Sequence, residues 1–413
     1  MYREIAVFLI LLNVFGCMLC KRDLEIGPPV ILVPGDGGSQ LEAKLNKTSV
    51  VHYLCAKTSD YFDLWLNLEL LVPMVIDCWV DNMKLIYDEK TRTTSNSPGV
   101  DITVPGFGNT STVEWLDPSQ ASPSAYFKSI ANALVGFGYE RGASLRAAPY
   151  DFRKGPHEQQ DYFTRMRSLV EETYEKNGMK RVVLLTHSMG GVMSLRFLQL
   201  QTQAWKNKYI RALVTLSAPW GGAIKSLKVF AVGDNLGIFV INEGILREEQ
   251  RSSPSLAWLL PSSMFWKTDE VLVSTADAKN YTVKDFEAFF RDIDYTTGWE
   301  MRKDVLSIAN DFTYPGVEVH CLHGLGVNTI ERLEYAAGKF PDGYPNLIFG
   351  DGDGTVNKRS LEGCTKWSQI GKKKNGRIYH QPIPGVSHMD ILTDDRVLSY
   401  LRSLLSGKRR KIM

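Results

Sequence analysis

Residues 181–191 read Arg-Val-Val-Leu-Leu-Thr-His-Ser-Met-Gly-Gly, and this stretch decides the fold. A short apolar run of valine and leucine that ends in a glycine-containing turn is typical of a buried parallel strand. The sequence after the turn predicts a helix that runs to about Leu200. A serine at such a sharp corner presents its hydroxyl above the sheet. Ser188 is therefore the candidate nucleophile.

The corner needs small residues two positions before and two after the serine, because strand and helix pass close together there. Gly190 meets the second requirement, whereas Thr186 stands where the usual pattern has glycine. A chance occurrence of this motif in a loop is the alternative interpretation. The strand and helix that flank the motif argue against it.

The segments around the corner alternate between helix and strand. Residues 162–177 carry apolar side chains at helical spacing, and residues 210–216 read as another parallel strand. This alternation predicts the α/β class with a right-handed sheet. A strand at 29–33 ends in the glycine-rich turn 34–39, which lacks the patterns of phosphate loops. We expect this turn to supply one backbone N–H of an oxyanion hole, and Met189 to supply the other.

An activated serine needs a base and an acid that orients the base, in the chain order serine, acid, histidine on this architecture. Of the seven histidines, only His380 and His388 follow the acidic turn at 350–356. His380 lies within a predicted strand, whereas His388 follows a Pro-Gly turn, so we predict His388 as the base. Asp353 is preferred to Asp351 as the acid because Gly-Thr-Val follows it just beyond a strand end.

Bulk properties favour a secreted globular protein. The 413-residue chain has a formal net charge of +2, from 48 basic and 46 acidic residues, which does not indicate nucleic acid. Residues 1–20 read as a signal peptide, with an uncleaved anchor as the alternative, and residues 21–413 as the mature catalytic domain. Asn46, Asn109 and Asn280 lie in glycosylation motifs, which agrees with the secretory route.

The cysteines agree with an oxidising compartment. Four remain after Cys17 and Cys20 are assigned to the signal, and four cysteines allow three pairings. We prefer the pairing of nearest neighbours in the sequence, which joins Cys55 to Cys78 and Cys321 to Cys364. No cysteine pair accompanies clustered histidines, and the Asp-Gly-Asp-Gly run lacks the calcium-loop spacing. The sequence therefore predicts no metal and no cofactor.

Two regions interrupt the α/β pattern. Residues 50–85 crowd large apolar side chains into a loop, and we expect this insertion to dock on a membrane, with buried packing as the alternative. The predicted lipid-facing side chains are those of Trp65, Leu66, Leu68, Leu70 and Leu71. Residues 223–312 are glycine-rich and irregular, and they read as a lid and cap over a cleft.

These stretches together resemble the lecithin–cholesterol acyltransferase family, nearest to its lysosomal phospholipase members. The resemblance covers essentially the whole mature chain. It implies an α/β-hydrolase fold with a membrane-binding insertion and a cap. Carried over by position, it implies a triad of Ser188, Asp353 and His388 and an oxyanion hole at Asp36 and Met189.

The same resemblance implies a chemistry. Family members cleave a phospholipid acyl ester through an acyl-serine, without calcium, and pass the acyl group to water or to a lipid alcohol such as ceramide. We therefore expect a phospholipid membrane surface and a ceramide-like acceptor as partners of a monomer in the lysosome lumen or outside the cell. A secreted phosphatidylcholine–sterol O-acyltransferase is the alternative within the family. A non-catalytic lipid carrier on the same fold is the alternative from another class.

Overall fold

The computed structural model describes residues 27–235, 242–277, 279–368 and 377–406. The predicted signal peptide, with Cys17 and Cys20, lies outside the described residues. Within the described ranges, no helix has the length and apolar character needed to cross a bilayer.

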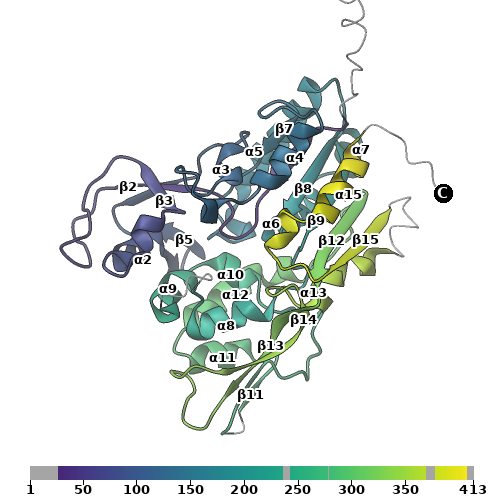
Figure 1. The fold of residues 1–413 in the computed structure, drawn as a ribbon. Helices are drawn as coiled ribbons and strands as arrows, with labels where there is room; N and C mark the ends of the chain where they lie inside the picture. Colours follow the sequence, from purple (N-terminus) through teal and green to yellow (C-terminus); the bar gives the residue numbers. More distant parts are fainter. Residues whose placement is uncertain (1–26, 236–241, 278, 369–376, 407–413) are drawn as a thin grey trace, which may run out of the picture.

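A parallel sheet of six strands forms the centre of the molecule (Figure 1). Its strand order is β15-β12-β9-β8-β1-β7, and every neighbouring pair is parallel. All of the residues of β1 and β8 are buried, as expected for strands that helices cover on both faces. The strand bounds are β1 Val30–Val33, β7 Leu145–Ala147, β8 Val182–His187, β9 Ile210–Leu216, β12 Val319–Leu325 and β15 Ile378–Pro384.

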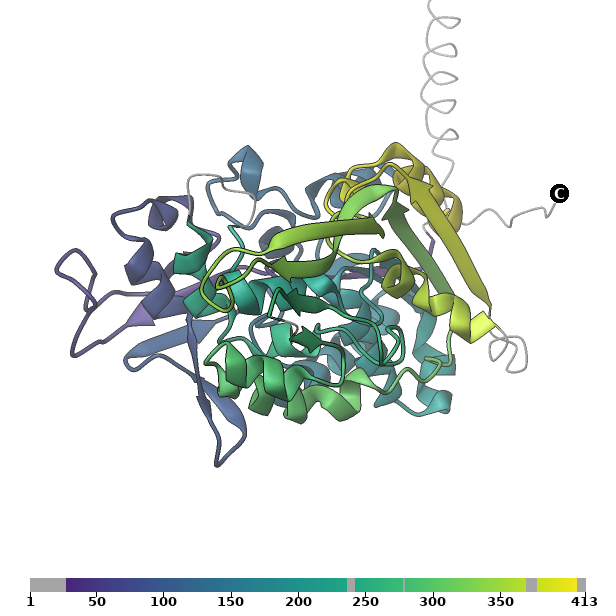
Figure 2. The same cartoon turned by 90° about the horizontal axis from the view of Figure 1, so that it is seen from below.

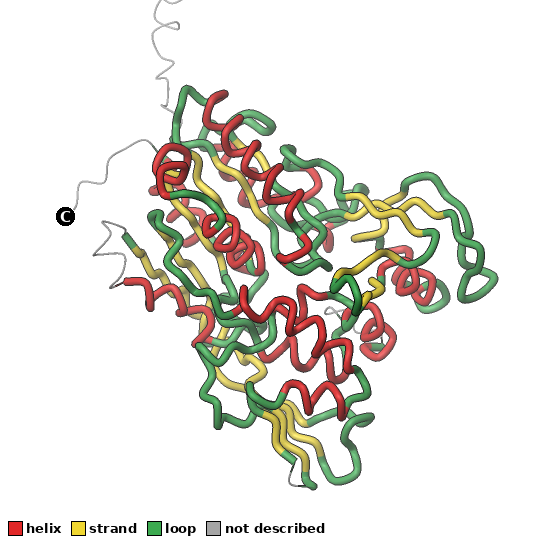
Figure 3. The backbone as a smooth tube through the Cα atoms, turned by 180° about the vertical axis from the view of Figure 1, so that it is seen from behind, coloured by secondary structure: helices red, strands yellow, loops and turns green. Residues whose placement is uncertain are grey.

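Helices cover both faces of this sheet (Figures 1 and 3). The helix predicted at 162–177 is α5, and the helix after the corner ends one residue before the predicted Leu200. Both helices direct a row of buried apolar side chains toward the sheet, as their spacing requires. The helices of the α/β core are α3 Ser111–Glu114, α4 Lys128–Gly136, α5 Gln160–Lys176, α6 Met189–Gln199, α7 Gln203–Tyr209 and α15 Asp395–Leu405.

The insertion between β1 and α3 projects away from the central sheet in both views (Figures 1 and 2). It holds a three-stranded sheet of order β3-β2-β6 and a hairpin of β4 and β5. A disulfide between Cys55 and Cys78 ties the loop after β2 to helix α2. The elements are β2 Leu41–Leu45, β3 Phe62–Trp65, the 3₁₀ helix η1 Leu68–Leu71, α2 Ile76–Met83, β4 Leu85–Asp88, β5 Thr93–Asn96 and β6 Val100–Thr103.

The cap follows β9 and has a hydrophobic cluster of its own. Buried residues of this cluster come from 224–301 but also include Leu333 and Tyr335. The predicted cap at 223–312 therefore omits two strands, β13 and β14, that complete the cap sheet of order β11-β10-β13-β14. The elements are α8 Ile224–Val232, α9 Glu243–Gln250, α10 Pro254–Trp258, β10 Val273–Thr275, β11 Asn280–Tyr281, α11 Phe286–Asp292, α12 Thr296–Ala309, β13 Val327–Tyr335 and β14 Asn346–Gly352.

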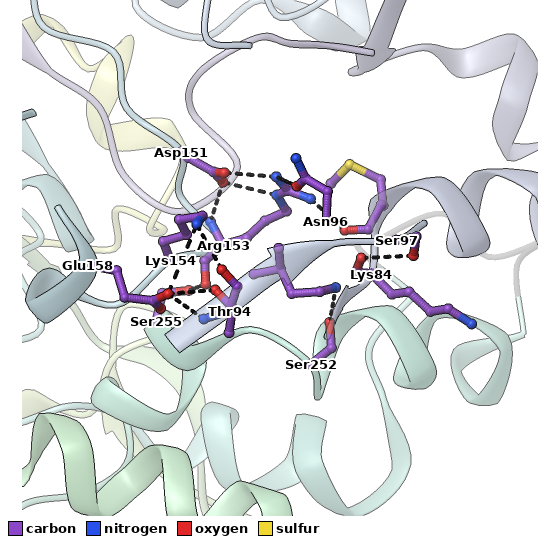
Figure 4. Close-up of polar contacts among 12 residues, drawn as sticks. Lys84, Thr94, Asn96, Ser97, Asp151, Arg153, Lys154, Glu158, Ser252 and Ser255 are labelled. Carbon is purple, nitrogen blue, oxygen red and sulfur yellow. Dashed lines mark hydrogen bonds and ion pairs between the residues drawn. The ribbon is translucent and has the colours of Figure 1, made fainter. Parts of the chain in front are cut away.

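A buried arginine connects the insertion, the core and the cap (Figure 4). Arg153 forms a two-point ion pair with Asp151, through contacts of 2.9 and 2.7 Å. Its guanidinium also donates to the Met83 carbonyl of α2 and to Asn96 of β5. Its own carbonyl accepts from the hydroxyl of Ser255 in α10. The side chain and the backbone of this one residue thus connect three regions of the chain by hydrogen bonds.

Candidate active site

The corner predicted from the sequence is present at Ser188. This residue joins β8 to α6 with φ 52° and ψ −129°, a conformation that costs energy for a residue with a Cβ. A Cβ on Gly190 would lie 2.4 Å from the carbonyl oxygens of both Val33 and Pro34. The demand for a small residue after the serine therefore comes from β1.

Thr186 is accommodated without crowding the corner. Its hydroxyl donates to the Val214 carbonyl of β9 at 3.3 Å, and the side chain is fully buried. A threonine can therefore replace the usual glycine at this position, because the neighbouring strand satisfies its hydroxyl.

Three side chains meet at the corner in the order that nucleophilic catalysis requires. The Ser188 hydroxyl lies 2.9 Å from His388 Nε2, and His388 Nδ1 lies 2.8 Å from an Asp353 carboxylate oxygen. The His388 backbone N–H also donates to the Asp353 carbonyl at 2.7 Å. The carboxylate fixes the imidazole with Nδ1 protonated, which leaves Nε2 free to accept the serine proton.

The electrostatics keep Asp353 ionised. Burial by itself would raise the pKa of this carboxyl, but the electrostatic attraction and hydrogen bond with His388 and the amides of Val356 and Thr355 outweigh it, so the pKa lies below its ordinary value. Asp353 follows β14, a strand of the cap sheet. Asp351, the weaker candidate, instead accepts from the Gly326 amide and pairs with Lys358.

Two backbone amides are available for an oxyanion. Met189 is the first residue of α6, where an N–H has no acceptor within the helix. On the turn after β1, the Gly35 N–H already donates to the Tyr126 hydroxyl, so the next residue, Asp36, is the turn's remaining candidate near the serine. A Cβ on Gly35 would lie 2.7 Å from the Ser188 Cβ, which shows how closely the turn approaches the nucleophile.

A hydrogen-bonded chain that the sequence did not reveal links this turn to the base. His187 Nε2 lies 2.9 Å from the His388 carbonyl, which can only accept, so Nε2 carries the proton. His187 Nδ1, 2.5 Å from the Tyr126 hydroxyl, must then accept from it. Burial and the nearby His388 lower the pKa of His187 to about 3, so its ring is neutral. No sequence pattern marks Tyr126, because it lies 61 residues from His187.

Comparisons with known proteins agree with this geometry. The family model of lecithin:cholesterol acyltransferase matches residues 61–395, which is most of the chain. The chain belongs to the lecithin:cholesterol acyltransferase family.

Two relatives with different names are similar to most of this chain. The chain is 49% identical to the human lysosomal phospholipase A and acyltransferase, over 92% of this chain and 91% of that protein. It is 43% identical to the phosphatidylcholine-sterol acyltransferase of Gallus gallus, over 90% of this chain and 89% of that protein. A chain of the crystal structure of the Tle4–Tli4 complex is similar over 92% of this chain and 98% of its own length, with 14% identity and a TM-score of 0.46.

In this acyltransferase-family chain, Trp65 is buried, whereas the sequence predicted a lipid-facing side chain. Its indole N–H donates to the Gly37 carbonyl at 2.7 Å, and its ring packs against Phe152 and Trp79. The prediction that Trp65 enters lipid is therefore wrong for this structure. The ring instead supports the turn that holds Asp36.

The other predicted lipid-facing residues are also covered. Leu66 and Leu71 are buried, and Leu68 and Leu70 are half-buried against the same core. The apolar side chains at residues 65–71 thus belong to the packed core, which was the alternative interpretation. Seven large apolar side chains of the insertion are exposed. Tyr61 and Ile86 lie elsewhere on it, and the other five lie on the two segments that the Cys55–Cys78 disulfide joins: Val51, Tyr53, Leu54, Val72 and Met74.

The remaining predicted sites are in accessible or bonded positions. Cys55 is bonded to Cys78 and Cys321 to Cys364, the pairing that the sequence favoured. The side chains of Asn46, Asn109 and Asn280 are exposed, as a glycan acceptor must be. Glycosylation at these positions stays a prediction.

Proposed function

We propose that this protein is a serine-dependent phospholipid acyl hydrolase and transacylase. The observation that carries the proposal is the pair of contacts that links Ser188, His388 and Asp353 at a strained corner. The names of the relatives support the substrate class: the human relative is a phospholipase A and acyltransferase.

The geometry supports the following steps. Ser188 Oγ attacks the ester carbonyl while His388 Nε2 takes the hydroxyl proton, and the N–H groups of Asp36 and Met189 stabilise the oxyanion. The ester C–O bond breaks, and the lysophospholipid leaves with the proton from His388. Water or a lipid alcohol then loses its proton to His388 and attacks the acyl-serine. The proton returns to Ser188 as the fatty acid or acylated alcohol leaves.

The triad is tested with a matched pair of aspartates. We expect Ser188→Ala to abolish hydrolysis of phospholipid vesicles and labelling by a fluorophosphonate. Asp353→Asn should lower kcat about 10⁴-fold, because the imidazole would lose its orienting charge. Asp351→Asn, two residues away and outside the triad, should leave kcat near the wild-type value. The assignment fails if Ser188→Ala retains activity or if the two aspartate variants behave alike.

A separate surface fits a membrane partner. Tyr53 and Met74 are exposed by 90% and 70% of their areas, and the Cys55–Cys78 disulfide brings their two segments together. A covalently linked pair of loops with exposed apolar side chains is suited to insert among lipid headgroups. We infer that Tyr53, Val72 and Met74 make the first contact with the phospholipid surface.

The docking surface is tested by separating binding from chemistry. The double variant Val72→Asp, Met74→Asp should lose sedimentation with vesicles and activity on them, yet hydrolyse a soluble short-chain ester at the wild-type rate. Met179→Asp is the control, because Met179 is also exposed but lies in the turn after α5, outside the insertion. Unchanged vesicle binding by the double variant would remove this surface from the proposal.

The acyl acceptor and compartment complete the proposal. We propose a ceramide-like lipid alcohol as the acceptor and the lysosome lumen or the extracellular space as the location, because identity to the lysosomal relative is higher than to the sterol acyltransferase. Vesicles that contain both ceramide and cholesterol, assayed at acid and neutral pH, separate the two. Acylceramide as the main product at acid pH supports the proposal, and sterol ester as the main product would favour the alternative.

A further inference from the structure

A cluster of possible metal ligands lies on the central sheet, apart from the catalytic triad. β12 and β15 are parallel neighbours, with Cys321 opposite His380 and His323 opposite Pro382. Residues two apart on a strand share a face, so His323 and His380 project from the same face of adjacent strands. Their Nε2 atoms lie 2.8 Å apart.

A third group reaches the same place from a different segment. The 3₁₀ helix η4, Glu362–Trp367, is bonded to β12 through the Cys321–Cys364 disulfide. Glu362 lies two residues before Cys364 on this helix. A ligand atom of each of His323, Glu362 and His380 falls within 4.8 Å of the other two.

A hydrogen bond already orients His323 as a metal ligand. Its Nδ1 lies 2.8 Å from the Gly324 carbonyl, which can only accept, so Nδ1 carries the proton. The Nε2 lone pair of the neutral ring therefore points toward His380 and Glu362. A histidine bound to a metal usually has such a hydrogen bond from its other ring nitrogen, and that bond fixes the tautomer.

We propose that His323, His380 and Glu362 form a binding site for a divalent first-row transition metal such as Zn²⁺. Two imidazoles and one carboxylate suit this class of ion, whereas Ca²⁺ and Mg²⁺ require oxygen ligands. Two nitrogens on one tetrahedral zinc lie about 3.3 Å apart, so a small rotation of the two rings would bring both Nε2 atoms onto one ion. The ion would join β12, β15 and η4, of which the disulfide joins only β12 and η4.

The site escaped the sequence analysis because its ligands share no short motif. His323 and His380 are 57 residues apart, and the parallel register of two strands brings them together. The expectation of no metal rested on the absence of cysteine and histidine clusters along the chain. The competing interpretation is a simple hydrogen bond, in which His380 Nε2–H donates to His323 Nε2.

Zinc titration of the full mature chain tests the proposal. Ser188 is first blocked with a fluorophosphonate, so that zinc binding at the catalytic triad is reduced. Calorimetry at neutral pH should then show one bound zinc ion per chain. His380→Gln, His323→Gln and Glu362→Gln should each weaken this binding, the histidine variants by more than about 100-fold. His52→Gln is the matched control, because His52 lies in the insertion, and its affinity should equal that of the wild type. Absence of zinc binding, or unchanged binding in His380→Gln, would overturn the site.

A second measurement needs no variant and so does not depend on variant folding. Diethylpyrocarbonate modifies accessible imidazole nitrogens, and mass spectrometry locates each modified histidine. His323 is buried, so the readout is His380, which zinc should protect in the wild-type chain while His52 is modified equally with and without the ion. Equal modification of His380 in both conditions would mean that the pair forms only a hydrogen bond.

Discussion

At the scale of single residues, Tyr126 is the least expected part of the site. Its hydroxyl accepts from Gly35 on the oxyanion turn and donates to His187, whose opposite nitrogen donates to the carbonyl of His388. One phenol therefore connects the turn proposed to stabilise the oxyanion to the segment that carries His388. Tyr126 touches no reacting atom and is a positioning residue.

Replacing Tyr126 tests this role. Tyr126→Phe leaves a buried Gly35 N–H and a buried His187 nitrogen without their partner, which should cost about 1–3 kcal/mol of stability. We expect kcat for a soluble ester to fall while KM changes little, because positioning affects the transition state more than the ground state. Tyr162→Phe is the control, since Tyr162 is also buried but bonds the Ala148 carbonyl at 3.3 Å. Equal kcat for both variants would reduce Tyr126 to a packing residue.

At the scale of elements, β3 supports the active site from within the insertion. Trp65, its last residue, donates to the Gly37 carbonyl, and a Cβ on Gly37 would lie 3.1 Å from the indole ring. Gly37 has φ 68°, a conformation that glycine adopts without strain. The insertion and the oxyanion turn are thus in direct contact.

A pair of tryptophans tests this contact. Trp65→Phe should lower kcat on a soluble ester by loosening the turn, and it should leave vesicle binding unchanged because the ring is buried. Trp367→Phe is the matched control: its indole also donates to a backbone carbonyl, that of Phe312, and its ring is also buried, but it lies in η4 outside the insertion. Both variants should lose similar stability, but only Trp65→Phe should lose kcat. Loss of vesicle binding by Trp65→Phe would restore the lipid-inserting role.

At the scale of the whole molecule, buried carboxyls make the fold sensitive to pH. Burial raises the pKa of Glu249 in α9 to about 8, and burial with the nearby Asp117 and Glu42 raises the pKa of Asp63 to about 8. The folded chain therefore holds two protons between about pH 4 and pH 8 that the unfolded chain has lost. This contribution to the free energy of unfolding is complete at acid pH and is lost as the pH rises through about 8.

The corresponding experiment compares melting temperatures at acid and neutral pH. Wild-type protein should melt at a lower temperature near neutral pH than near pH 5. The amides of Glu249→Gln and Asp63→Asn stay neutral, so the combined variant should show a smaller difference. Asp269→Asn is the control, because it replaces a carboxylate with an amide in the exposed turn before β10. A combined variant with the full wild-type difference would assign the pH dependence to other groups.

The sequence predicted the parts of the site that follow strand ends. Chain order and turn chemistry indicated Ser188, Asp353 and His388, and these residues meet. Contacts between distant segments left no such signal. The two roles of Tyr126 and the burial of Trp65 depend on how separate loops fold over one another. An apolar stretch such as 65–71 reads the same whether core or lipid covers it.

The contacts around Arg153 also bear on how such proteins can be recombined. The insertion is fastened to the cap directly as well, because the Leu85 amide donates to the Ser252 hydroxyl and Lys84 pairs with Glu248. A chimera that takes only the insertion or only the cap from a relative would lose the contacts between the two regions. The smallest exchangeable module is therefore the insertion and the cap together, and a chimera with a relative should exchange both.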